Sequence, residues 1–300
     1  MNTKNLIIDG TNIEYRIFFV ENSWKNHNIE TDTTTRVETI PRFLVTFKKL
    51  IQHFNPDNVY CTWDRKLEYP STNFRDTLLN GAYKADRVEH EKVGDMFEQE
   101  PLLRDILTTL GVKHFFPNTL EADDVVYWLS KTVDGNSVIV TGDHDLYQAI
   151  NEHVSVWNLK QLITVDNFKQ HAGVDIKHFK LYKAIKKDSD NIDGIPGYGK
   201  VKAAVLSQNF ENNKLTDEQK QIVERNLKLI DLDYGFNNQP GELDSYKKQF
   251  ESIHSTYDFD EFMVFCKKHN LSDVLINTSE WRRLFKRNTL VDIINQLNIR

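Results

Sequence analysis

Nine Asp and Glu residues stand in five short clusters across the first two thirds of the chain. Like charges that share one cleft repel each other and resist ionisation, so a convergent set of carboxylates needs a cation. Oxygen ligands suit hard divalent ions such as Mg²⁺ and Mn²⁺. A pair of such ions can activate water and stabilise the leaving oxygen in phosphodiester hydrolysis. The nine residues are Asp9, Asp64, Glu121, Asp123, Asp124, Asp143, Asp145, Asp188 and Asp190.

Taken singly, these clusters also fit plainer structures. Acidic residues such as those in "EADD" stabilise the start of a helix, and "TGDHD" fits an Asx-type turn. The joint pattern favours a metal site, because Asp9, Asp64 and Asp143 each follow an apolar, β-rich run. We expect His144, between two of the acidic residues, to be a bystander.

Other catalytic chemistries lack their motifs. The sequence contains no CxxC or HExxH, which argues against zinc, and no G-x-S-x-G, P-loop or dinucleotide-binding fingerprint. The expected chemistry is therefore metal-assisted hydrolysis of a phosphodiester.

The elements that must position the carboxylates alternate between strands and helices. "NLIID", "NVYCTW" and "SVIVTGD" are typical of strands, whereas "IPRFLVTFKKLIQHF" and "DVVYWLSKTV" have helical spacing. This alternation predicts an α/β fold with a mostly parallel central sheet flanked by helices. Ligands bind such sheets at the carboxyl ends of the strands, where the acidic residues stand. We expect a nuclease α/β domain over residues 1–176, with an exposed excursion at about 65–100, and a mainly helical region over 177–300.

A second motif lies in "DNIDGIPGYGKVKAA", where Gly194, Gly197 and Gly199 precede a helix that begins near Lys200. Glycines permit close backbone approach, and the N–H groups of a helix start bind phosphate. An ordinary turn between helices would also contain glycine, but the spacing favours a DNA-binding helix–hairpin–helix. The lysines at 177, 180, 183, 186 and 187 precede it, and we expect them to follow duplex phosphates.

The order of "DGTN", "WD", "EADD", "TGDHDLYQ", "DSDN" and "GIPGYGK" resembles the 5′-nuclease superfamily of flap endonucleases and 5′-3′ exonucleases. "RNLKLIDLDY" is similar to stand-alone phage members, notably the T-even phage ribonuclease H. The resemblance implies a metal-dependent phosphodiesterase with 5′-3′ exonuclease, flap endonuclease and ribonuclease H-like activity. Its implied role is RNA primer removal in phage DNA replication. The implied partners are flap or nicked duplex DNA, RNA/DNA hybrids and replication proteins.

The resemblance also assigns roles to residues. It implies one Mg²⁺ (or Mn²⁺) at Asp9, Asp64, Glu121 and Asp123, and a second at Asp143, Asp145 and Asp190, with Asp124 between them. The resemblance implies that the excursion is a helical arch and that its Lys84 and Arg87 act in catalysis. It assigns DNA binding to Arg75, Tyr83 and the hairpin. At the hairpin, K⁺ is a further candidate cation. One departure concerns Asp188: the family has two Asp three residues apart before the hairpin, whereas Asp188 is two before Asp190. Either Asp188 moves into place or the second site is weakened.

Composition sets further bounds. The net charge of −6 argues against a simple nucleic-acid binder, but without the nine carboxylates the balance would be −6 + 9, about +3. Two distant cysteines indicate a reducing, cytoplasmic location, and we expect neither a signal peptide nor a membrane span. Two alternatives stay open: a catalytically weak or inactive junction-DNA-binding protein, and a small toxin-type ribonuclease, which the length and the hairpin disfavour.

Overall fold

A six-stranded sheet lies at the centre of the computed structural model, which describes residues 3–22, 39–65, 73–85, 93–187, 190–253 and 257–284. Arg87 and Asp188 lie outside these ranges. The strand order is β3-β2-β1-β4-β5-β6, and all neighbours are parallel except β5 and β6. The strands are β1 (Asn5–Asp9), β2 (Asn58–Thr62), β3 (Lys113–Phe115), β4 (Ser137–Val140), β5 (Val154–Trp157) and β6 (Leu162–Ile163). The predicted mostly parallel α/β fold is confirmed, and the sequence analysis missed the short strands β3, β5 and β6.

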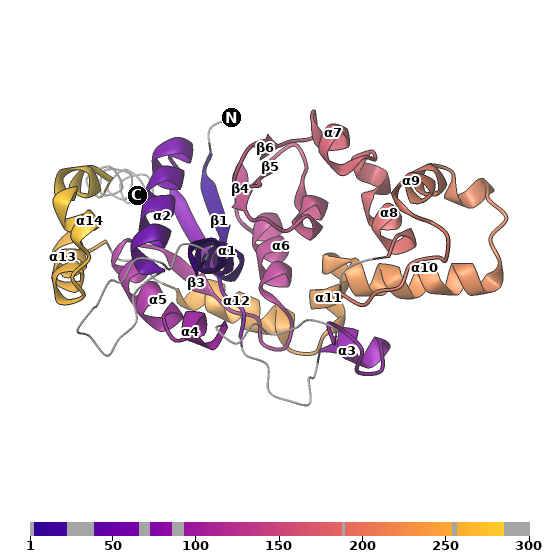
Figure 1. Cartoon of the computed structure of the whole chain (residues 1–300), viewed down its shortest axis with the longest axis horizontal. Helices are drawn as coiled ribbons and strands as arrows, with labels where there is room; N and C mark the ends of the chain where they lie inside the picture. The colour runs from indigo at the N-terminus through magenta and orange to yellow at the C-terminus, as the bar shows by residue number, and fades with distance from the viewer. Residues whose placement is uncertain are drawn as a thin grey trace.

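Helices cover both faces of the sheet, and Figure 1 shows α13 and α14 at one end of an elongated molecule and α9 and α10 at the other. The α-helices are α1 (Gly10–Asn22), α2 (Ile40–Phe54), α3 (Phe74–Leu78), α4 (Val93–Phe97), α5 (Glu100–Thr109), α6 (Ala122–Thr132), α7 (Phe168–Ala172), α8 (Phe179–Ile185), α9 (Lys200–Gln208), α10 (Asp217–Ile230), α11 (Leu232–Asn238), α12 (Glu242–Ser252), α13 (Phe259–Lys268) and α14 (Ser272–Ile276). Short 3-10 helices are η1 (Asp145–Ala149), η2 (Ile176–His178) and η3 (Phe210–Asn212).

Side chains alternate between two cores, because successive residues of a strand point to opposite faces. In β1, Ile7 joins the core beneath α6, whereas Leu6 and Ile8 join the core beneath α2 and α5. Helix α2 supplies Phe43, Phe47 and neighbouring apolar residues to the second core, on the face that its periodicity predicted.

The chain beyond the expected boundary at 176/177 packs against both cores. Helix α11 contacts α6, and α13 contacts α5. Buried Phe262 and Trp281 belong to the same core as α2. The helical region therefore wraps back onto the sheet, and its treatment as a separate domain stays a prediction. Among the described helices, none has the length and apolar composition that a membrane span requires.

Candidate metal centre

The carboxyl edge of the sheet brings together acidic side chains from three neighbouring strands. Asp9 ends β1, Asp64 follows β2 by two residues, and Asp143 follows β4 by three. The Thr141 hydroxyl donates to Asp9 at 2.7 Å, and the Ala122 amide donates to Asp64 at 2.7 Å. This edge is also the point where the chain order reverses on either side of β1, which is where ligands bind open α/β sheets.

Close packing of β1 against β2 leaves little space around Gly10, the residue that follows Asp9. A Cβ on Gly10 would lie 2.8 Å from Cys61 Sγ and 2.8 Å from the Thr62 carbonyl oxygen. Glycine after Asp9 therefore allows helix α1 to begin directly at the sheet.

The electrostatics of the edge are those of carboxylates without enough positive charge. Burial and the neighbouring Asp64 and Asp143 raise the pKa of Asp9 to about 7, although hydrogen bonds from Thr141 and Asn12 oppose the change. Burial and several carboxylates, Asp143 first, also raise the pKa of Asp123 well above its usual value. Burial and Glu121 raise the pKa of Asp64.

These residues fit a divalent cation by the chemistry of their oxygen atoms and by their mutual repulsion. Within the described ranges, no three acidic, His or Cys side chains are already arranged around a single metal position.

Lys84 supplies a positive charge on one side of the cluster. Its ammonium donates to Glu121 and lies 3.7 Å from Asp190 Oδ2, and the Tyr83 hydroxyl donates to Glu121 at 2.9 Å. Burial alone would raise the pKa of Glu121, but Lys84 and Arg75 outweigh it and lower the pKa to about 2. The backbone of Lys84 has a φ of 57°, an uncommon conformation for a residue other than glycine.

Lys183 supplies a second positive charge to the cluster, beside Asp145, and this role was not predicted. Its side chain is buried and its ammonium donates to Asp145. For Lys183 the structure shows a pair with a carboxylate of the cluster, and the expectation that the lysine run follows DNA phosphates stays a prediction. Lys180 pairs with Asp231, and Lys187 lies 3.2 Å from exposed Asp193.

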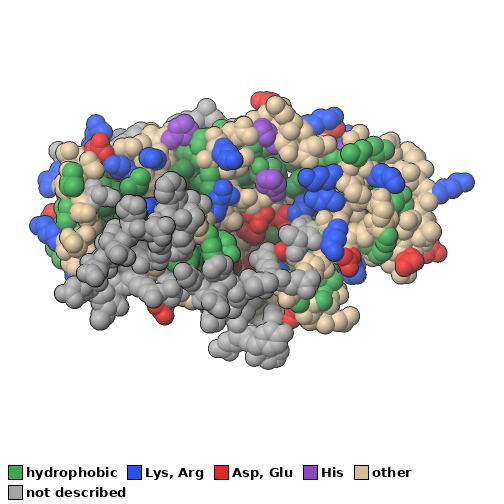
Figure 2. All heavy atoms as spheres, in the orientation of Figure 1, with side chains coloured by type: hydrophobic (Ala, Val, Ile, Leu, Met, Phe, Trp, Pro, Cys, Tyr) green, Lys and Arg blue, Asp and Glu red, His purple; other side chains and the backbone are tan. Residues whose placement is uncertain are grey.

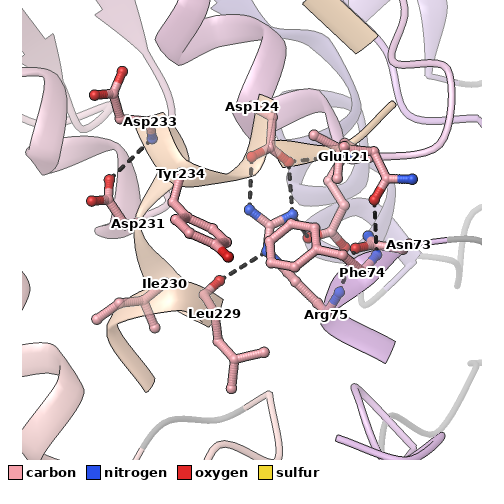
Figure 3. A network of polar contacts seen from close by, with 12 residues as sticks. Asn73, Phe74, Arg75, Glu121, Asp124, Leu229, Ile230, Asp231, Asp233 and Tyr234 are labelled. Atoms are coloured by element: carbon pink, nitrogen blue, oxygen red, sulfur yellow. Dashed lines mark hydrogen bonds and ion pairs between the residues drawn. The ribbon is translucent and has the colours of Figure 1, made fainter. Parts of the chain in front are cut away.

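Arg75 and Asp124 form a buried pair, which corrects the expectation for Arg75 (Figure 3). The Arg75 guanidinium donates to both oxygens of Asp124, at 2.7 and 2.8 Å, and to the Leu229 carbonyl at 2.8 Å. Arg75 is 2% exposed and Asp124 is fully buried. The prediction that Arg75 contacts DNA is wrong, because all its guanidinium nitrogens are used inside the protein. Both oxygens of Asp124 accept from that guanidinium, and Oδ2 also accepts from the Glu121 amide at 3.2 Å, so its place between the two metal groups stays a prediction.

A groove of about 840 Å³ leads from the carboxylates to helix α9. Its lining includes Asp143, Asp145 and Asp190 of the acidic cluster together with Lys200 and the exposed Val201 of α9. Burial lowers the pKa of His144, and Lys183, Lys186 and Lys200 act in the same direction while Asp143 opposes them. Figure 2 shows acidic side chains in a hollow near the centre of this face, with a group of Lys and Arg side chains beside it.

The predicted hairpin is a glycine-rich turn that joins α8 to α9. A Cβ on Gly194 would collide with the Ile185 carbonyl oxygen, and the Ile195 amide donates to that oxygen at 2.9 Å. Gly197 has a φ of 82°, and Gly199 directly precedes α9. The turn therefore needs glycine at Gly194 for space and at Gly197 for conformation.

Comparisons with known proteins show the family of the chain. Residues 4–174 match the family model of the 5′-3′ exonuclease N-terminal, resolvase-like domain. The chain is 31% identical over 215 residues to a 5′-3′ exonuclease of Mycoplasmopsis pulmonis, covering 70% of this chain and 67% of the relative. It is 29% identical to a 5′-3′ exonuclease of Bacillus subtilis, covering 70% and 71%.

A solved structure has the same fold. The flap endonuclease of bacteriophage T5, in a pseudo-enzyme-product complex with DNA and metal ions, aligns with a TM-score of 0.63 and 21% identity. The alignment covers 88% of this chain and 99% of that one. Together with the family model, these matches show that the chain belongs to the 5′-3′ exonuclease family of nucleases.

Proposed function

We propose that this chain is a metal-dependent, structure-specific 5′-nuclease that acts as a 5′-3′ exonuclease and a flap endonuclease. The observation that carries the proposal is the group of carboxylates at the sheet edge. Asp9, Asp64 and Asp123 have raised pKa values because they are buried beside other carboxylates. A site that concentrates uncompensated oxygen ligands is suited to divalent cations, and such cations would offset the negative charge of a phosphodiester.

Two ions are the proposed cofactors, Mg²⁺ with Mn²⁺ as a substitute. Asp9, Asp64, Glu121 and Asp123 would hold one, and Asp143, Asp145 and Asp190 the other. When bound, such ions activate water and stabilise the leaving oxygen of the phosphodiester. Asp188 stays a candidate ligand that lies outside the described residues.

The cations of the chain would orient the substrate. Lys84 places a positive charge between Glu121 and Asp190, where the scissile phosphate would approach. Arg87, outside the described residues, is proposed to assist it, and Tyr83 to lie beside the 5′ strand. The groove from Asp143 to Lys200 would hold the strand that leads to the hairpin, where the amides at the start of α9 suit a phosphate.

The proposed substrates are flap or nicked duplex DNA and RNA/DNA hybrids. The corresponding role is removal of RNA primers during phage DNA replication, alongside other replication proteins. The glycine-rich hairpin, residues 194–199, is proposed to bind duplex DNA with K⁺ as a bound cation. The local support is its backbone geometry and its exposed Lys200.

A labelled 5′-flap DNA incubated with the pure protein tests this function. Cleavage near the junction should require Mg²⁺ or Mn²⁺ and stop when a chelator is added. If neither ion supports cleavage while the protein binds the flap tightly, the chain is a junction-binding protein and the nuclease proposal fails.

A further inference from the structure

A second groove, apolar in character, lies between α1, α2 and the turn that joins β5 to β6. Its volume is about 680 Å³. Most of its apolar lining is only half-buried, so the groove is open to a partner. The apolar residues that line it are Ile13, Ile17, Val45, Leu50, Phe54, Trp157 and Leu159.

Cationic side chains surround this apolar surface. Arg16, Arg42, Lys49 and His53 line the groove and are exposed. None of the described residues that line it is acidic, although the chain as a whole carries a net charge of −6. The surface therefore combines apolar contact with a local excess of positive charge.

Leu159 forms part of the wall in an unusual backbone conformation. Its φ is 69°, a left-handed value that is uncommon for a large side chain. The Asn158 side chain holds the turn by accepting from the amides of Lys160 and Gln161, at 3.1 and 2.9 Å. Glycine or asparagine would be less strained than leucine at this position of the turn. The Leu159 side chain packs against the core beside the groove.

The aromatic rings of the groove already have partners. The Trp157 ring lies 5.3 Å from the His53 ring and 5.5 Å, edge to face, from the Phe54 ring. The remaining surface is largely aliphatic. Single-stranded nucleic acid is bound by free aromatic faces on which bases stack, so this surface suits aliphatic side chains better than bases.

We propose that this groove binds a short acidic segment of a partner protein. The segment would fold as an amphipathic helix, with aliphatic side chains in the groove and carboxylates beside Arg16 and Lys49. Helix-in-groove recognition uses such an apolar stripe, and charge complementarity selects the partner. Val45, Lys49 and His53 are four residues apart and therefore lie along one side of α2, where all three line the groove.

The position of the groove would keep the partner close to the substrate without covering the carboxylates. Asn12 lines the groove of the metal centre, and Arg16, one helical turn further along α1, lines the apolar groove. The docking proposal does not depend on the nuclease activity, since it concerns a different surface.

Fluorescence anisotropy with labelled peptides tests the proposal on the full chain. The probe is an acidic peptide of roughly twelve residues with Leu at helical spacing, about three turns in length. A scrambled peptide of the same composition, in which Leu no longer lies on one face, is the matched probe. A labelled oligo-dT of similar charge tests the nucleic-acid alternative.

Two variants address the groove and two matched variants control for charge. Val45→Asp places a negative charge on the apolar wall of the groove, and Lys49→Glu reverses the charge of an exposed residue beside it. Val264→Asp and Lys267→Glu make the same changes on exposed positions of α13. Circular dichroism checks folding, and flap cleavage should be unchanged in all four.

The helical peptide should bind the wild type and the two control variants with the same affinity. Its affinity for the groove variants should be lower by about tenfold or more. The scrambled peptide should bind about tenfold more weakly as well, and higher salt should reduce binding of the helical peptide. Absence of binding, equal binding of both peptides, or equal binding to Lys49→Glu and wild type would overturn the proposal. Loss of oligo-dT binding in the groove variants, with the peptide unaffected, would assign the groove to nucleic acid instead.

Discussion

Arg75 donates two hydrogen bonds to Asp124, and the pair joins α3 at the base of the expected arch to the helix that presents Glu121 and Asp123. The same guanidinium reaches the Leu229 carbonyl at the end of α10. A Cβ on Gly235 would lie 2.6 Å from Asp124 Oδ1 and 3.0 Å from Arg75 Nη2, so the pair also needs glycine in α11. One buried ion pair therefore connects α3, the start of α6 with its acidic residues, and the helical region (Figure 3).

Arg75→Ala should lower the free energy of unfolding by about 3–5 kcal/mol, because it leaves the Asp124 carboxylate buried and unpaired. Urea unfolding monitored by fluorescence measures the change. Lys131→Ala is the matched control, since it breaks an exposed pair with Asp233 that contributes less than about 1 kcal/mol. Similar losses in the two variants would contradict a structural role for Arg75. Arg75→Lys should recover only part of the stability, because an ammonium cannot reproduce the two parallel hydrogen bonds.

Glu14→Gln should make the protein more stable at alkaline pH. Glu14 is fully buried, and neither carboxyl oxygen has a hydrogen-bond partner within the described part of the chain. Burial and then Glu100 raise its pKa from 4.5 to about 8, although the nearby polar side chain of Thr39, whose hydroxyl donates to Gln99, and the charge of Arg104 oppose the change. The folded state therefore holds a proton that the unfolded state releases above about pH 4.5.

The resulting pH dependence has a definite sign. The contribution of Glu14 to stability is complete below about pH 4.5 and is lost as the pH rises to about 8. The loss is at most about 5 kcal/mol. Thermal unfolding at about pH 5 and pH 8.5 should show a smaller decrease for Glu14→Gln than for the wild type. Parallel pH profiles would mean that Glu14 is ionised in the folded protein.

Divalent metal should bind more tightly as the pH rises from about 6 to 8, because the ligands must lose protons. The pKa of Asp9 is about 7 in the metal-free protein, so a large fraction of this carboxyl is protonated at the lower pH. Calorimetry with Mn²⁺ in two buffers of different ionisation enthalpy would count the protons released. An affinity that does not change over this range would show that Asp9 is not a ligand. Asp9→Asn should weaken binding and reduce the number of protons released.

Lys84→Ala should lower the cleavage rate by roughly 10²–10³-fold, the usual effect of losing one charged donor at the reacting phosphate. Removal of the ammonium beside Glu121 and Asp190 should at the same time tighten metal binding in the absence of DNA, because a competing cation is lost. Single-turnover cleavage and Mn²⁺ titration measure the two effects. Lys84→Arg retains the charge and is the matched variant. A rate within about twofold of the wild type for Lys84→Ala would remove this residue from the active site.

The sequence was sufficient to predict those features of the site that depend on the local order of residues along the chain. Asp9 ends one apolar strand and Asp143 lies three residues after another, and parallel strands place their carboxyl ends at one edge, so the position of both residues at that edge could be predicted. Arg75 and Asp124 are 49 positions apart, and Lys183 and Asp145 are 38 apart. No periodicity connects such partners, because tertiary packing alone brings them together. The strand β6 was missed because it has only two residues, so that its pairing and not its composition defines it. The strand β5 has the same length as β4 and a β-rich sequence, Val-Ser-Val-Trp, so the sequence carried a signal for it that the prediction overlooked.

The central claim is that carboxylates at the sheet edge carry out hydrolysis while other surfaces bind DNA. Asp143→Asn tests it most directly, with cleavage of a labelled 5′-flap DNA in Mg²⁺ and the dissociation constant in Ca²⁺ measured on the same preparation. The variant should lose cleavage by at least about 10³-fold, while its affinity for the flap stays within about threefold of the wild type. Cleavage by Asp143→Asn at close to the wild-type rate would contradict the claim, and so would a loss of DNA affinity as large as the loss of cleavage.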